Sequence, residues 1–229
     1  MTSAGGVCDQ TVLDALRAAG IPLERRGRAR AEPLSENERQ FYFWILRQFA
    51  AGTPPSADAM RGAARNFGID SDEARAVLAR KDLVHTDTDG RPLVAYPFSA
   101  KARGHRVLIN DEQTVQAMCA VDALGIAPML NLPVEVVSHD PVSSAEIRVQ
   151  ISSKKSATWQ PATAVVLAGS AGCDGPSFRG CCDVLNFFET PENAESFLRE
   201  HPEIAGSTIS IPEAIEAGRV VFGDVLRED

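Results

Sequence analysis

The stretch from Ala117 to Leu130, AMCAVDALGIAPML, constrains the fold most, because it holds one charged side chain among fourteen residues. A segment this apolar is typical of a helix buried on nearly all sides. We predict a helix over residues 111–127, which ends or kinks where Pro128 cannot continue the hydrogen-bond ladder. Asp122 is then buried too. It follows Cys119 by three residues, so the two side chains share one face of the helix.

A thiol and a buried carboxyl group in one pocket have a chemical use. Burial without a cationic partner raises the pKa of a carboxyl group, so Asp122 is expected to hold a proton near neutral pH and to deliver it. Cys119 would be the nucleophile beside this proton donor. The alternative is a core cysteine next to an aspartate that bonds to backbone, and the pair alone leaves that alternative open.

The composition is that of a folded globular protein, with 44% hydrophobic and 24% charged residues among 229. The net charge of −8 argues against general affinity for nucleic acid or anionic membranes. No apolar run is long enough to predict a transmembrane helix, and the N-terminal residues do not read as a secretory signal. We therefore expect a cytoplasmic protein whose thiols are free.

The cysteine and histidine patterns argue against a disulfide framework or a structural zinc site. The five cysteines are odd in number and include no Cys-x-x-Cys pair. Nucleotide-binding and hydrolase motifs are also missing from the sequence. The four histidines stand alone, so we interpret each as a surface or satisfied core residue; they are His85, His105, His139 and His201.

We predict three parts: an extension and linker over residues 1–34, a winged-helix-like module over residues 35–98, and a catalytic domain over residues 99–229. The module is predicted from three helices followed by a hairpin with an Asp89-Gly90 turn. Its first helix has Ser35 as the cap and a glutamate at the capping-box position. The second helix stops near Gly68, and Ser71 is the predicted cap of the third.

The charge of this first part argues against DNA binding. Residues 1–100 carry 13 basic and 13 acidic side chains, which leaves the module neutral. A packing or lid module is therefore the favoured interpretation, because a DNA-binding winged helix needs a basic recognition surface.

The catalytic domain is predicted to be α+β, with a mixed β-sheet and flanking helices. We predict a helix in TPENAESFLREH, with Thr190 as its N-cap and proline at its first position. In AEIRVQIS the apolar residues alternate, as they do along a strand with one buried face. The expected strands are HRVLI, PVEVVS, AEIRVQIS, ATAVVLAG, DVLNFF and GRVVFGDVL.

A second cysteine feature lies in SFRGCCDVLNFF, which contains Cys181 and Cys182. If the doublet belongs to the strand, its two side chains face opposite sides, so at most one of them reaches a given pocket. The alternative is that a cysteine here is simply a small buried hydrophobic residue, which suits one of the two well.

QAMCAVDALGIAPML, followed some sixty residues later by CCDVLNFF, resembles the organomercurial (alkylmercury) lyases. The resemblance covers roughly residues 35–225 and implies a winged-helix-like part before a mixed-sheet catalytic part. It places the catalytic residues at Cys119, Asp122 and Cys182, where Cys182 is matched by counting back from the Phe-Phe pair. The doublet leaves the choice between Cys181 and Cys182 slightly open.

The resemblance implies a reaction. Thiolates are preferred ligands of the soft ion Hg(II), and Cys119 and Cys182 would hold the mercury of an organomercurial substrate. Asp122 would take a proton from a cysteine and return it to the carbon. The product Hg(II) would leave to small solvent thiols or to a mercuric reductase. No cofactor is implied. The metal ligands would be Cys119 and Cys182, for mercury as substrate or product only, and Asp122 would join them in binding that mercury.

The chain departs from the family where relatives have a further cysteine after a Ser-His step, because Asp140 stands there. We interpret that cysteine as structural, so its loss should leave activity intact. Cys8 and Cys173 match nothing in the family. The alternative function is a soft-metal-binding winged-helix regulator or mercury carrier without lyase activity.

Overall fold

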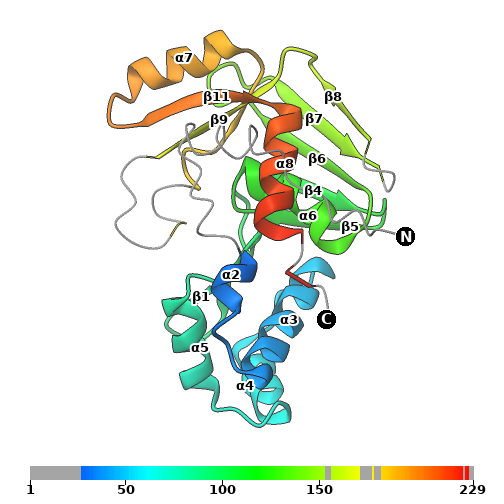
Figure 1. The fold of residues 1–229 in the computed structure, drawn as a ribbon, viewed down its shortest axis with the longest axis vertical. Helices are drawn as coiled ribbons and strands as arrows, with labels where there is room; N and C mark the ends of the chain where they lie inside the picture. Colours follow the sequence, from blue (N-terminus) through cyan, green and yellow to red (C-terminus); the bar gives the residue numbers. More distant parts are fainter. Residues whose placement is uncertain (1–26, 153–155, 171–176, 178–181, 224, 227–229) are drawn as a thin grey trace, which may run out of the picture.

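The computed structural model describes residues 27–152, 156–170, 177, 182–223 and 225–226 (Figure 1). Its first part is helical. The helices there are α2 (Gly27–Ala31), α3 (Glu36–Ala50), α4 (Ala57–Asn66) and α5 (Ser71–Arg80). The predicted capping box of α3 is confirmed, since Ser35 and Glu38 bond to each other's backbone N–H groups. The predicted cap of α5 is wrong by one residue, because the Asp70 carboxylate accepts two backbone N–H groups of the first turn.

A large antiparallel sheet follows these helices and takes in the predicted hairpin. Its order is β1-β2-β3-β5-β4-β6-β7-β8. The strands are β1 (Val84–Thr86), β2 (Pro92–Ala95), β3 (Phe98–Ser99), β4 (Arg106–Ile109), β5 (Gln113–Ala117), β6 (Val134–His139), β7 (Glu146–Ile151) and β8 (Ala157–Gln160). The predicted mixed sheet is wrong on strand direction, because the pairs in the described residues are antiparallel. Short connections between neighbouring strands favour this arrangement.

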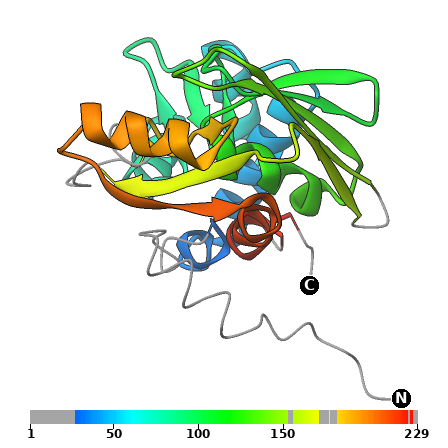
Figure 2. The ribbon, with the colours of Figure 1, turned by 90° about the horizontal axis from the view of Figure 1, so that it is seen from above.

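A smaller antiparallel sheet has the order β10-β9-β11, and α7 lies along it (Figure 2). Its elements are β9 (Val165–Ser170), β10 (Phe187–Phe188), α7 (Pro191–Glu200) and β11 (Ala205–Ser210). The predicted cap of α7 is confirmed, because the Thr190 hydroxyl accepts the N–H of Asn193. The sheet matters for the site because β10 follows directly after the Cys182 segment.

Two predictions around the apolar stretch are wrong. Residues 113–117 form β5, and the helix α6 (Ala120–Leu130) begins only after Cys119, which is its N-cap. Pro128 lies within the last turn, so the predicted end at Ala127 is wrong, while the predicted kink stays a prediction. The stretch is buried nearly throughout, as its composition predicts.

The predicted strand GRVVFGDVL is also wrong, since its first residues belong to the helix α8 (Ile211–Phe222). This helix packs on α6 at two glycines. A Cβ on Gly218 would lie 2.7 Å from the backbone nitrogen of Gly125, and a Cβ on Gly125 would meet the ring of Phe222 at 2.4 Å. The close contact of α6 with α8 therefore requires glycine at both positions.

One hydrophobic core joins the N-terminal helices to the large sheet. Phe49 of α3, for example, stacks on Phe98 of β3 with 6.0 Å between ring centroids. The predicted division between residues 98 and 99 falls within β3, and the three-part division stays a prediction. None of the described helices has the length and apolar character needed to cross a membrane.

Candidate functional site

Cys119 sits at the junction between β5 and α6. Its backbone is extended, with φ −155° and ψ 179°, and its Sγ accepts the backbone N–H of Asp122 at 3.4 Å. Neighbouring backbone bonds fix the junction on both sides: Met118 N–H donates to Pro97 O at 3.0 Å, and Ala120 N–H donates to Leu185 O at 2.8 Å. The thiol is thus held at a helix N-terminus, where N–H groups stabilise a thiolate when it forms.

Asp122 lies in the first turn of α6 and is buried, with 6% of the residue exposed. Asp122 lies beside Cys119, as its spacing predicts, although the geometry comes from a helix cap and not from a continuous helical face. An acidic residue in a first turn usually gains from the helix dipole. Here its removal from water is the larger effect, as its pKa shows below.

Cys182 joins Cys119 and Asp122 from a segment that lies 60 residues after Asp122 in the chain. It lies in a turn that precedes β10, so the predicted strand is wrong at this residue. Its Sγ donates to Asp122 Oδ2 at 3.8 Å, and its backbone N–H donates to Ser177 O at 3.0 Å. The reactive atoms of Cys119, Asp122 and Cys182 all lie within 4.8 Å of one another. Cys8, Cys173 and Cys181 lie outside the described residues.

Burial governs the protonation of these groups. It raises the pKa of Asp122 to about 7, although hydrogen bonds from the cysteines and the charge of Arg30 act to lower it. Burial also raises the pKa of the Cys119 thiol well above its usual range. For Cys182 the hydrogen bond with Cys119 lowers the pKa, but burial and the charge of Asp122 outweigh it and raise the pKa. The resting site therefore favours two thiols beside a carboxyl group that exchanges a proton near neutral pH.

Two arginines lie near the site, and no sequence pattern predicts their place there. Arg103 donates its Nε–H to Met118 O at 3.2 Å and forms an ion pair with Asp183, the residue after Cys182. It thereby ties the Cys119 junction to the Cys182 turn. Arg30 comes from α2, in the segment predicted to be a linker, and its charge reaches Asp122. Sequence patterns could not find these residues, because their partners lie far away in the chain.

Tyr96 is a further buried polar group beside the site. Its hydroxyl has no hydrogen-bond partner within the described part of the chain. Burial raises the pKa of this phenol, and the charges of Cys182, Asp82 and Asp122 raise it further. Tyr96 also lies one residue before Pro97, whose carbonyl bonds to Met118.

The histidines have other roles. His105 is buried, its Nδ1 lies 2.9 Å from Ser138 Oγ, and burial lowers its pKa to about 4. His85 pairs with Asp82 and His201 with Glu203. His139 ends β6 and is exposed. Among the described residues, the group that could hold a metal ion is formed by the two cysteines and Asp122, a donor set that suits soft ions.

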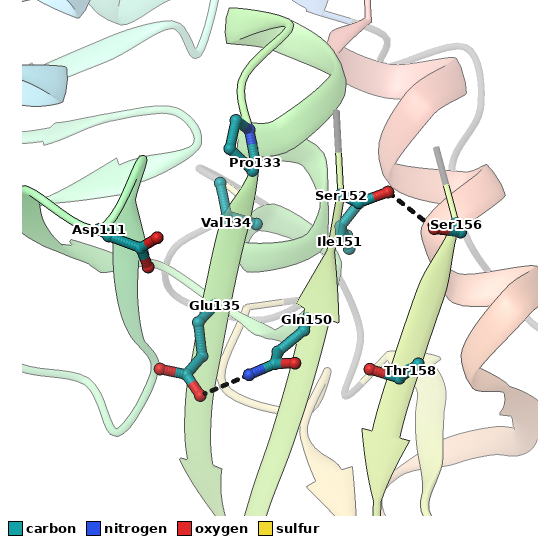
Figure 3. A pocket seen from close by; sticks show the side chains of 9 residues that line it. All are labelled: Asp111, Pro133, Val134, Glu135, Gln150, Ile151, Ser152, Ser156 and Thr158. Atoms are coloured by element: carbon teal, nitrogen blue, oxygen red, sulfur yellow. Dashed lines mark hydrogen bonds between the residues drawn. The ribbon is translucent and has the colours of Figure 1, made fainter. Parts of the chain in front are cut away.

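A hollow of about 330 Å³ lies elsewhere, over strands β6 to β8 (Figure 3). Polar side chains on its wall bond to one another, Glu135 with Gln150 at 3.3 Å and Ser152 with Ser156 at 2.7 Å. It contains neither cysteine of the buried site nor Asp122. The candidate functional site is therefore the buried cluster with its reactive groups, and not this open hollow.

Comparison with known proteins gives relatives of one kind. The alkylmercury lyase of Staphylococcus epidermidis is 26% identical over 175 residues, which cover 76% of this chain and 78% of that protein. The Bacillus cereus alkylmercury lyase is 27% identical over 178 residues, covering 77% and 78%. The Streptomyces lividans alkylmercury lyase is 24% identical over 185 residues, covering 81% and 83%.

A solved structure, the mercury-bound form of MerB2, has a TM-score of 0.74 with 19% sequence identity and covers 90% of this chain and 98% of that one. It shows the same fold. The family model for alkylmercury lyase, MerB, matches residues 98–223, which include the whole buried site. The chain therefore belongs to the alkylmercury lyase family.

Proposed function

We propose that this protein is an organomercurial lyase, which cleaves the carbon–mercury bond by protonolysis to give a hydrocarbon and Hg(II) in mercury detoxification. The observation that carries the proposal is the buried cluster of Cys119, Asp122 and Cys182, whose reactive atoms lie within 4.8 Å of one another. Family membership supports the same reaction.

The first step is capture of the substrate. The sulfur of Cys119 replaces the weaker ligand X⁻ on R–Hg–X, and the thiol proton leaves the site together with X⁻. The N–H of Asp122, 3.4 Å from Sγ, stabilises the negative charge that develops on this sulfur. A thiolate is a strong ligand for a soft metal ion, so this step proceeds although burial raises the thiol pKa.

The second step brings in the other thiol. Cys182 Sγ already points its proton at Asp122 Oδ2, 3.8 Å away. As the Cys182 sulfur bonds to mercury, the proton moves to the Asp122 carboxylate. A pKa near 7 suits this group to both halves of a proton transfer.

The third step breaks the carbon–mercury bond. Asp122 gives its proton to the carbon, and the electron pair of the C–Hg bond becomes the new C–H bond. The hydrocarbon leaves, and mercury stays as Hg(II) on the two sulfurs. In sum, one R–Hg⁺ and two thiols give R–H, a bis-thiolate Hg(II) and one proton. Because water is excluded from the site, the proton on Asp122 is reserved for the carbon.

The proposal extends to the fate of the product. Small solvent thiols or a mercuric reductase take the Hg(II) from the site in a cytoplasmic setting.

The proposal also includes the N-terminal part of the protein. The helices α3 to α5 and the β1–β2 hairpin form a winged-helix-like module that packs against the catalytic part. Their placement in one core with the sheet supports a packing role. The neutral charge of residues 1–100 is evidence against a DNA-binding regulator.

The test is to incubate the purified protein with phenylmercuric acetate and excess thiol, and to measure benzene by gas chromatography. We expect benzene from the wild type and none above background from Asp122→Asn or Cys119→Ser. Mercury capture without benzene in the wild type would favour the carrier or regulator function. Full activity in Cys182→Ser would show that another thiol completes the site.

A further inference from the structure

Asp82 occupies a backbone position that normally belongs to glycine. It follows α5 with φ +52°. Its N–H donates to Ala79 O and the N–H of Leu83 donates to Leu78 O, both at 3.0 Å. This is the Schellman ending of a helix, whose left-handed residue is usually glycine because other side chains are strained there. An aspartate at such a position points to a use for its side chain.

The carboxylate of Asp82 binds a residue 95 positions away. Asp82 Oδ2 accepts the hydroxyl of Ser177 at 2.6 Å and its backbone N–H at 3.2 Å. Asp82 Oδ1 lies 2.7 Å from Nε2 of His85. These bonds lower the pKa of Asp82 even though burial acts to raise it, so the carboxylate is charged at neutral pH.

Arg30 completes the cluster from α2. Its guanidinium lies 3.1 Å from Asp82 Oδ2, donates to the backbone oxygen of Asp82 at 2.8 Å, and donates to Ser177 Oγ at 3.3 Å. The side chains of Arg30 and Asp82 are only 15% and 18% exposed. An ion pair this well shielded, with several hydrogen bonds, fixes geometry far better than an exposed pair.

The cluster ends at a catalytic cysteine. The backbone oxygen of Ser177 accepts the N–H of Cys182 at 3.0 Å, so a continuous path of bonds runs from Arg30 through Asp82 and Ser177 to Cys182. We propose that Arg30 and Asp82 are positioning residues, which hold the backbone of Cys182 so that its sulfur meets Cys119 on the same mercury atom. The inference rests on the proposed function and adds residues to it that do not touch the substrate.

The cluster has its shortest bonded path to Cys182. Cys119 is fixed by β5, by α6 and by its neighbours' backbone bonds, whereas the hydrogen bonds from Ser177 to Asp82 lead in one further bond to the backbone of Cys182. Weakening the cluster should therefore leave substrate capture by Cys119 intact and slow the step that needs both sulfurs. Outer partners that orient metal-binding residues commonly change affinity or activity by about 10–100-fold.

The experiment uses the full chain with Asp82→Asn, Ser177→Ala and Asp82→Gly. Iodoacetamide labelling of each cysteine is followed by peptide mass spectrometry, and benzene release from stoichiometric phenylmercuric acetate is followed in single turnovers. Asp111→Asn is the matched control, because Asp111 is also a left-handed aspartate, at φ +58°, but exposed and away from the site. Asp82→Gly removes the carboxylate and places glycine where the backbone is left-handed. Because glycine is unstrained there, this variant should not lose its fold through backbone strain.

We expect Cys182 to be labelled faster in Asp82→Asn and Asp82→Gly than in wild type, while the labelling rate of Cys119 is unchanged. Benzene release should slow by about tenfold while phenylmercury capture is unchanged. Ser177→Ala should show the same effects more weakly, and Asp111→Asn none. Unchanged Cys182 labelling in folded Asp82 variants, or equal acceleration of both cysteines, would overturn the inference. If the Asp82 variants do not fold, the labelling of Ser177→Ala decides it. Labelling needs no lyase activity, so a wild type that released no benzene would refute the proposed function alone.

Discussion

Replacing Asp122 with asparagine should stabilise the protein while abolishing its proposed activity. The side chain keeps its size and loses its charge. Asp122 is buried, with 6% exposed, and its pKa rises from the ordinary 3.8 to about 7 because ionisation in this pocket is unfavourable. Asparagine removes that unfavourable ionisation.

The magnitude follows from proton linkage. Between pH 3.8 and 7 the folded protein keeps the Asp122 proton, whereas the unfolded chain has lost it. The free energy of unfolding therefore falls as the pH rises through this window, by about 1.4 kcal/mol per pH unit from this one group. Over the whole window the sum is roughly 4 kcal/mol, and above pH 7 the contribution is constant.

The assay is urea unfolding of wild type and Asp122→Asn at half-unit steps from pH 4 to 8. The difference in unfolding free energy, variant minus wild type, should rise with pH up to about pH 7 and then level off. Other titrating groups are common to both proteins and cancel. The pH dependence is the test, because any repacking around the amide adds a constant. A difference that is flat from pH 4 to 7 would refute the idea that Asp122 is held protonated by burial.

Three further substitutions test single contacts. Gly218→Ala should lower the unfolding free energy by about 1–3 kcal/mol in thermal melts, because its Cβ would lie 2.7 Å from Gly125 N; an unchanged melting temperature would contradict this close packing. Asp140→Asn should lower the unfolding free energy by about 1–3 kcal/mol and leave benzene release intact. Asp140 is 1% exposed, and its carboxylate accepts three backbone N–H groups and an Asn193 amide. Lost activity in the folded variant would count against its structural role. Tyr96→Phe should raise the free energy of unfolding, measured in urea, by about 1 kcal/mol, because it removes a buried hydroxyl without a described partner. A clear loss of stability would mean that the hydroxyl is bonded.

Local signals predicted local structure well. The Ser35–Glu38 capping box gave the start of α3, and the Asp89-Gly90 turn gave the β1–β2 hairpin. The Cys119–Asp122 spacing placed two of the three reactive groups together, because residues three apart meet both on a helix face and at a helix cap. These features depend on neighbours in the chain, which the sequence displays directly.

The errors came where the pattern was ambiguous or the contact was distant. The apolar run VVFGDVL fits a strand or a buried helix, and the stronger signal was the capping box of Ser210 and Glu213 before it. The start of α6 was placed too early because β5 is short and Val115 within it lies at helical spacing from Met118 and Cys119. Cys182 could be placed beside Cys119 only by resemblance to the family, and no local pattern pointed to Arg30 or Asp82.

Native mass spectrometry after one equivalent of phenylmercuric acetate is added to wild type and to Asp122→Asn tests the roles of the three residues. The wild type should carry bare mercury, while the variant should carry mercury with its phenyl group still attached. The sulfurs of Cys119 and Cys182 hold the metal in both proteins, and only the wild type has Asp122 to supply the proton to carbon. A variant that carries bare mercury and releases benzene at the wild-type rate would contradict this role of Asp122.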